Sequence, residues 1–70
     1  MEEFKETIDE LNNLGYRTPY IELALSLEFG RINKILKNET EILPEEIALF
    51  RILRMCPSII DIAANKFEVM

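Results

Sequence analysis

The chain contains no histidine and no tryptophan, and its 70 residues include a single cysteine, Cys56. One cysteine excludes an internal disulfide, and without histidine no zinc site of the usual Cys/His composition can be assembled. The only serines, Ser26 and Ser58, have no evident general base, and no phosphate-cradling glycine motif or carboxylate-rich metal loop is present. We therefore expect neither an enzyme nor a protein that carries a cofactor or a metal.

Long apolar segments are also missing from the sequence. No run of about 20 apolar residues is available to span a bilayer, and the acidic N-terminus lacks the apolar stretch of a signal peptide. Hydrophobic residues make up 49% of the chain, with only two glycines and three prolines, which is typical of a globular protein. We expect a soluble cytoplasmic protein without membrane contact, folded as one domain over residues 1–70.

Basic residues are scarce. Eight lysines and arginines stand against 13 acids, for a net charge of −5, whereas phosphate contacts normally make nucleic-acid-binding domains basic. The charge is unevenly distributed, because residues 1–16 and 39–50 each carry −4, residues 17–38 carry +2 and residues 51–70 carry +1. The segment 17–38 is therefore the part of the chain best suited to face an anionic partner.

Helical signals occur along the whole sequence. Apolar residues recur at helical spacing near the N-terminus, Gly15 follows as a left-handed helix end, and Pro19 and Pro44 suit the first turns of helices. These signals predict an all-α chain with five helices, at about residues 2–14, 18–25, 30–37, 44–55 and 58–66. The tail 67–70 alternates apolar and polar residues, which leaves a short strand open as an alternative.

The stretch Ile21–Leu36 combines a short apolar helix pattern, a break and a second helix pattern. On the second helix, Ile32, Ile35 and Leu36 supply an apolar inward face. The remaining arc holds polar and basic side chains, namely Arg31, Asn33, Lys34 and Lys37. This pattern is typical of a helix-turn-helix, whose second helix lies in the DNA major groove.

Three segments of the chain resemble the lambda-repressor-like family of helix-turn-helix regulators, which includes Cro-type phage repressors and many antitoxins. Ile21–Leu27 is similar to the family's signature over the second helix and turn, Arg31–Leu36 to the recognition helix of antitoxin members, and Pro44–Leu49 to the start of the fourth helix. The resemblance covers about residues 18–53. It implies a compact five-helix domain with the helix-turn-helix on helices 2 and 3, at about residues 18–37.

The family resemblance also implies a function. We expect a transcriptional regulator, such as a small repressor, that binds double-stranded DNA sequence-specifically, as a homodimer on an inverted-repeat operator. The candidates for base-edge contacts are Arg31, Asn33 and Lys34, because arginine and lysine suit guanine and asparagine suits adenine. The candidates for phosphate contacts flank them and are Arg17, Thr18, Tyr20, Lys37 and Asn38.

The C-terminal segment 57–70 is a candidate for dimerisation. Its predicted helix carries more apolar surface than one short terminal helix needs for docking, and a second subunit could cover the excess. The candidate interface residues are Ile59, Ile60, Ile62 and Ala63.

Two residues depart from the family pattern. Glu22 stands where the family keeps a small alanine against the third helix, and Ser26 replaces the usual glycine of the turn. A carboxylate at a close contact between helices is costly to bury unless it is paired, and Arg31 or Lys34 are the expected partners.

The acidic charge also supports an alternative interpretation. The chain could be a protein–protein interaction module, such as an antirepressor, a toxin-neutralising protein or an inhibitor, that keeps the helical fold without binding DNA. In that case an acidic surface would contact the protein partner, with Glu39, Glu41, Glu45 and Glu46 as the residues that matter.

Overall fold

The structure is a computed structural model that describes the backbone of residues 2–68 and the side chains of residues 2–65. All regular secondary structure in this range is helical, which confirms the predicted all-α class, and Phe67 and Glu68 extend the last helix instead of forming a strand. Residues 69 and 70, at the end of the predicted dimerisation segment, lie outside the described residues. The five helices within residues 2–68 are α1 (Glu2–Asn13), α2 (Thr18–Ala24), α3 (Arg31–Leu36), α4 (Pro44–Met55) and α5 (Ile59–Glu68).

The first three helices end in the same way. Each is followed by a left-handed residue, which is Gly15 (φ 100°) after α1, Ser26 (φ 58°) after α2 and Asn38 (φ 60°) after α3. The next amide turns back to a carbonyl of the last helical turn, as in the 2.8 Å bond from Leu27 N–H to Glu22 O. This is the Schellman motif, which satisfies carbonyls that the helix leaves without partners.

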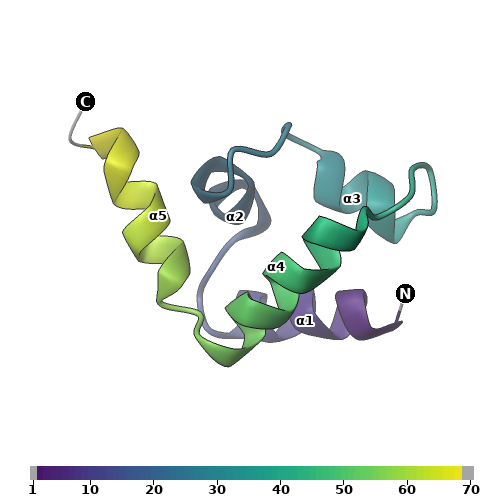
Figure 1. Cartoon of the computed structure of the whole chain (residues 1–70), viewed down its shortest axis with the longest axis horizontal. Helices are drawn as coiled ribbons and strands as arrows, with labels where there is room; N and C mark the ends of the chain where they lie inside the picture. Colours follow the sequence, from purple (N-terminus) through teal and green to yellow (C-terminus); the bar gives the residue numbers. More distant parts are fainter. Residues whose placement is uncertain (1, 69–70) are drawn as a thin grey trace.

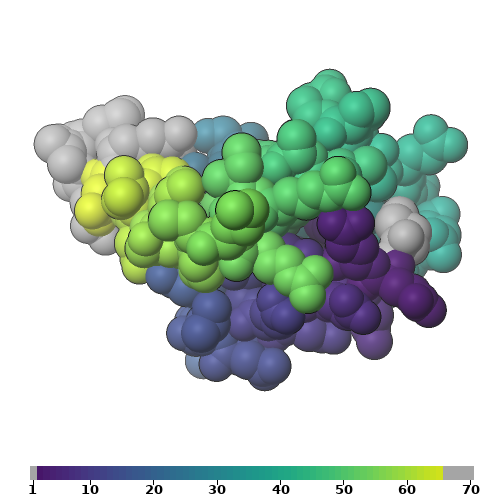
Figure 2. Space-filling view, turned by 60° about the horizontal axis from the view of Figure 1, so that its bottom comes forward, coloured from purple at the N-terminus to yellow at the C-terminus, as the bar shows by residue number. Residues whose placement is uncertain are grey.

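The helices form two packed groups that meet at one core (Figure 1). α1 packs against α4, where the rings of Phe4 and Phe50 meet edge to face with centroids 5.0 Å apart, and Figure 2 shows these two helices in contact across one face of the molecule. α2 packs against both α3 and α5. The buried core draws on all five helices and consists of Phe4, Ile8, Leu11, Ile21, Ala24, Ile32, Ile35, Phe50, Leu53, Ile60 and Ala64.

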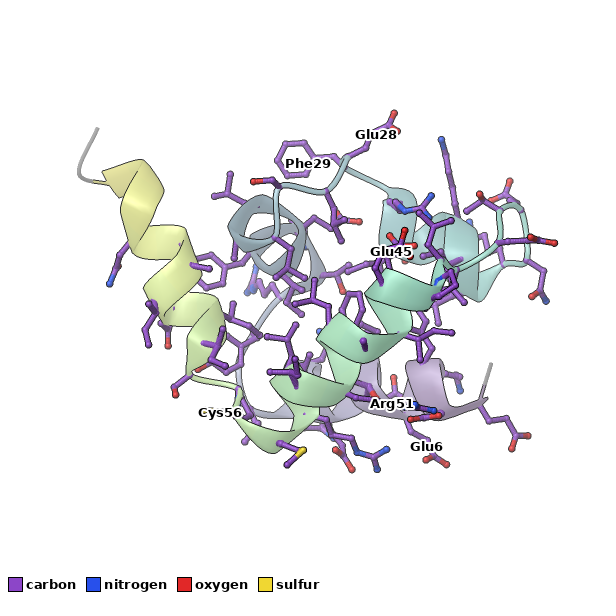
Figure 3. The ribbon with its side chains drawn as sticks, in the orientation of Figure 1. Glu6, Glu28, Phe29, Glu45, Arg51 and Cys56 are labelled. Atoms are coloured by element: carbon purple, nitrogen blue, oxygen red, sulfur yellow. The ribbon has the colours of Figure 1, made fainter. Side chains whose placement is uncertain are left out.

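Surface ion pairs join α4 to α1. Arg51 donates from Nε and Nη2 to the two carboxylate oxygens of Glu3, and Arg54 makes the same double contact with Glu10 at 2.9 and 3.0 Å. Glu6 lies 3.9 Å from Arg54, and Figure 3 shows Glu6 and Arg51 on this side of the molecule. Because these side chains are largely exposed, each pair adds little stability, but the two arginines of α4 are occupied by intramolecular partners.

α5 is attached to α2 through Asp61. One carboxylate oxygen of Asp61 accepts from the hydroxyl of Tyr16 at 2.9 Å, and the other accepts from the hydroxyl of Tyr20 at 3.0 Å. The two tyrosine rings stack with their centroids 6.5 Å apart. The hydrogen bond to Asp61 raises the pKa of Tyr16 above its usual value, since an ionised phenol could no longer donate.

Candidate nucleic-acid interface

The turn between α2 and α3 has a fixed backbone conformation. It spans residues 25–30, with left-handed backbone at Ser26 near its start and at Gly30 (φ 91°) where α3 begins. Ser26 therefore adopts a left-handed conformation that glycine takes without strain, at a cost of about 1–2 kcal/mol for a side chain in this region. The six-residue α3 that follows is only about 9 Å long.

Glu22 links α2 directly to the beginning of α3. The residue is 2% exposed, and its two carboxylate oxygens accept from backbone amides, Oε1 from Gly30 N–H at 3.2 Å and Oε2 from Ile32 N–H at 2.9 Å. These amides belong to the group at a helix start that has no partner within the helix. The expected pairing of Glu22 with Arg31 or Lys34 is thus wrong, because the carboxylate is satisfied by the main chain of α3 and not by a charged side chain.

Arg31 makes its hydrogen bonds within the molecule. Its Nε and Nη2 donate to the two carboxylate oxygens of Glu46 in α4, at 2.7 and 2.6 Å, and Nη2 also donates to Glu41 O at 3.2 Å. The side chains of Arg31 and Glu46 are 22% and 9% exposed. Glu46 also accepts from Leu43 N–H, so one carboxylate caps α4 and holds α3 against it.

The Arg31–Glu46 ion pair shifts the pKa of both groups. Hydrogen bonding to the Arg31 guanidinium lowers the pKa of the Glu46 carboxyl below its usual value, and this effect outweighs the opposing effect of burial. The same bonds raise the pKa of Arg31. These bonds use the Nε and Nη2 donors of Arg31 and hold its side chain against α4, so the structure gives Arg31 a part in supporting α3 that the sequence did not indicate.

The other predicted residues of α3 remain at the surface. Asn33, Lys34 and Lys37 are exposed, while Ile32 and Ile35 of the same helix are buried. Their spacing of three and four residues places the three exposed side chains on one side of the helix. Asn38, which follows in the left-handed conformation, is exposed as well.

The predicted phosphate contacts of α2 have different environments. Arg17 precedes the helix as its exposed N-cap residue, and Thr18 is partly buried at the first helical position. Tyr20 is partly buried, and its hydroxyl donates to Asp61 of α5. Of these three side chains, that of Arg17 is the best placed to meet an external anion.

Most of the described basic side chains that form no ion pair lie in one segment of the chain. Among the side chains of residues 2–65, every arginine except Arg17 is ion-paired with a glutamate. The basic side chains of this range that form no ion pair are Lys5, Arg17, Lys34 and Lys37. Three of these four belong to residues 17–38, where Glu28 is the one exposed acid.

Lys5 and Phe29 are surface residues outside the set predicted from the sequence. Lys5 of α1 lines a surface hollow of about 140 Å³ together with Glu2, Leu36 and Asn38, which places it beside the end of α3. Lys5 is the only base among residues 1–16, and this is the sequence feature that could have singled it out. Phe29, in the turn, is 68% exposed.

The predicted dimer residues of α5 are mostly used inside the chain. Ile60 is fully buried in the core, and Ile59 and Ala63 pack against it from partly buried positions, whereas Ile62 is 69% exposed. Met55, at the end of α4, is another strongly exposed apolar residue. Most of the apolar side chains of α5 that were predicted to face a second subunit are therefore covered within the chain, where α5 packs against α2.

Comparisons with family models, with curated proteins and with solved structures find no match to this chain. No helix within the described residues has the length and apolar character needed to cross a membrane.

Proposed function

We propose that the chain is a helix-turn-helix regulator that binds double-stranded DNA with the exposed side of α3 and the start of α2. The observation that carries this proposal is the distribution of cations: outside α1, the described basic side chains without an ion-paired carboxylate are Arg17, Lys34 and Lys37. Cations that are not neutralised within the molecule can release counterions from DNA phosphates, which drives binding.

Different residues make the contacts to base edges and the contacts to phosphates in this proposal. Asn33 is the candidate for a base edge, because a carboxamide can bind adenine N6 and N7 at once, and Lys34 next to it suits guanine. Arg17, Lys37 and Asn38 flank them and serve the phosphates, which set position and not sequence. If two copies bind a palindrome, as the lambda-repressor-like resemblance implies, the selected sites will be inverted repeats with half-sites about one helical turn apart.

The proposal is tested by selecting DNA from a random duplex pool and measuring the affinity for the selected site over a range of salt concentrations. Arg17 and Lys37 are the two cations assigned to phosphates, so log affinity should fall by about 1.8 per unit of log salt for each bound chain, at about 0.9 per phosphate. Replacing Lys34 and Lys37 by glutamine should reduce this slope by about 0.9, because Lys37 is the one of the two that is assigned to a phosphate.

Arg54→Gln is the control for this experiment because it removes a positive charge from the same chain at a residue already paired with Glu10. It should leave the slope per bound chain unchanged. A selection that enriches no sequence, or a lysine double variant with the slope of the wild type, would refute DNA binding by this surface. Failure of the selection would favour the alternative of a protein partner at the exposed Glu39, Glu41 and Glu45, since Glu46 is committed to Arg31.

A further inference from the structure

The turn between α2 and α3 presents an aromatic side chain to solvent. Phe29 is 68% exposed, and Figure 3 shows Phe29 and Glu28 projecting from the turn away from the rest of the molecule. Phe4 and Phe50 are by contrast buried in the core. Among the side chains of residues 2–65, Phe29 is the one exposed phenylalanine.

The backbone that carries Phe29 is held on both sides. Before it, Leu27 packs against the core and donates its amide to Glu22 O at 2.8 Å. After it, the Glu22 carboxylate accepts from the amides of Gly30 and Ile32. A contact residue on a fixed backbone loses less conformational entropy on binding than one on a flexible loop.

Phe29 directly precedes Gly30, the N-cap of α3. The N-terminal part of the second helix is the part that a helix-turn-helix presents to base edges. At this end of α3, Arg31 is polar and bound through Nε and Nη2 to Glu46, and Ile32 is buried. Phe29 is therefore the apolar side chain that is exposed at the N-terminal end of α3.

We infer that Phe29 contacts the C5-methyl group of a thymine in the major groove, an inference that rests on the proposed DNA binding. A phenyl ring has no hydrogen-bonding group, and the methyl of thymine is the apolar group among the base edges of the major groove. The neighbouring Glu28 carboxylate is repelled by phosphates, which disfavours a position of the turn against the DNA backbone. Phe29 thus reads thymine, while Asn33 and Lys34 read hydrogen-bonding groups.

The experiment replaces individual thymines of the selected duplex by deoxyuridine, which removes the methyl group and preserves base pairing. For the wild-type chain, one such replacement should weaken binding about fourfold, the effect expected for a single buried CH₂-sized group. Phe29→Ala should bind the thymine and deoxyuridine duplexes equally, and Phe29→Leu should retain part of the difference. Leu14→Ala, which truncates an apolar residue 62% exposed at the end of α1, should keep the full discrimination.

The outcomes separate this inference from the proposed function. If the wild-type chain enriches no DNA, the proposed function fails. If it binds a selected site but does not distinguish thymine from deoxyuridine at any position, or if Phe29→Ala still distinguishes them, DNA binding stands and the role of Phe29 is overturned. A Phe29→Ala variant that keeps the discrimination but sediments as a smaller species would assign the ring to a contact between copies, which also overturns it.

Discussion

Replacing Glu46 tests whether Arg31 supports the fold. The Glu46 carboxylate is 9% exposed at the side chain and accepts two hydrogen bonds from Arg31 and one from Leu43 N–H. Breaking a fully buried pair costs about 3–5 kcal/mol and breaking an exposed one less than about 1 kcal/mol. With Arg31 22% exposed, Glu46→Ala should lower the free energy of unfolding by about 2 kcal/mol, an intermediate cost.

Urea unfolding followed by the helical circular dichroism signal measures this loss, which corresponds to a fall in Tm of about 8–16 °C for a domain of this size. Glu45→Ala is the matched control, because Glu45 is the adjacent but exposed acid of the same helical turn. It should cost less than about 1 kcal/mol, the range of a carboxylate at a helix N-terminus.

The pH dependence of the same loss follows from the lowered pKa of Glu46. A carboxyl with a lower pKa in the folded state contributes stability that is fully present above its unfolded pKa, about 4.3, and that is lost as the pH falls through the folded pKa. The difference between the wild type and Glu46→Gln should therefore shrink in acid and stay constant near neutrality.

Two results would refute this assignment of Arg31. One is a Glu46→Ala variant that unfolds at the same urea concentration as Glu45→Ala. The other is an Arg31→Gln variant that keeps wild-type stability and loses only DNA affinity, which would return Arg31 to the base contacts first expected of it.

Two further predictions concern the backbone and the tyrosines. Ser26→Gly should raise the free energy of unfolding by about 0.5–1 kcal/mol, because glycine adopts the left-handed conformation without strain; Ser58→Gly, at an exposed position with ordinary backbone angles, should not stabilise the chain in the same urea experiment. In a Tyr20→Phe background, the tyrosinate absorbance should report a Tyr16 pKa above the ordinary value near 10, and Asp61→Asn should lower it. If Asp61→Asn left the pKa of Tyr16 unchanged, the result would contradict the hydrogen bond between Tyr16 and Asp61.

The helix pattern could be predicted from the sequence because its signals are local. Gly15 ends α1 and Pro44 starts α4 through their own backbone preferences, and neither depends on a distant residue. The apolar spacing likewise indicated that Ile32, Ile35 and Leu36 face inward. Ile32 and Ile35 are buried, whereas Leu36, at the end of α3, is 36% exposed.

The roles of several polar residues could not be predicted because their partners are distant or belong to the main chain. Arg31 looked like a surface residue of α3, but its partner Glu46 lies 15 positions later on another helix. Glu22 is paired with backbone amides, which a search for opposite charges does not consider. Ile60 was predicted to face a second subunit because the packing of α5 against α2 is not visible in the apolar pattern of α5 alone.

The bonds of Glu22 have a consequence for engineering the chain. A helix of six residues does not persist by itself, and here the beginning of α3 is held by a carboxylate from α2. Residues 31–37 are therefore not a unit that can be exchanged alone without loss of the α3 helix. A transplant has to move residues 18–37 as one cassette with Glu22 retained, together with a glutamate at position 46 of the host to receive Arg31.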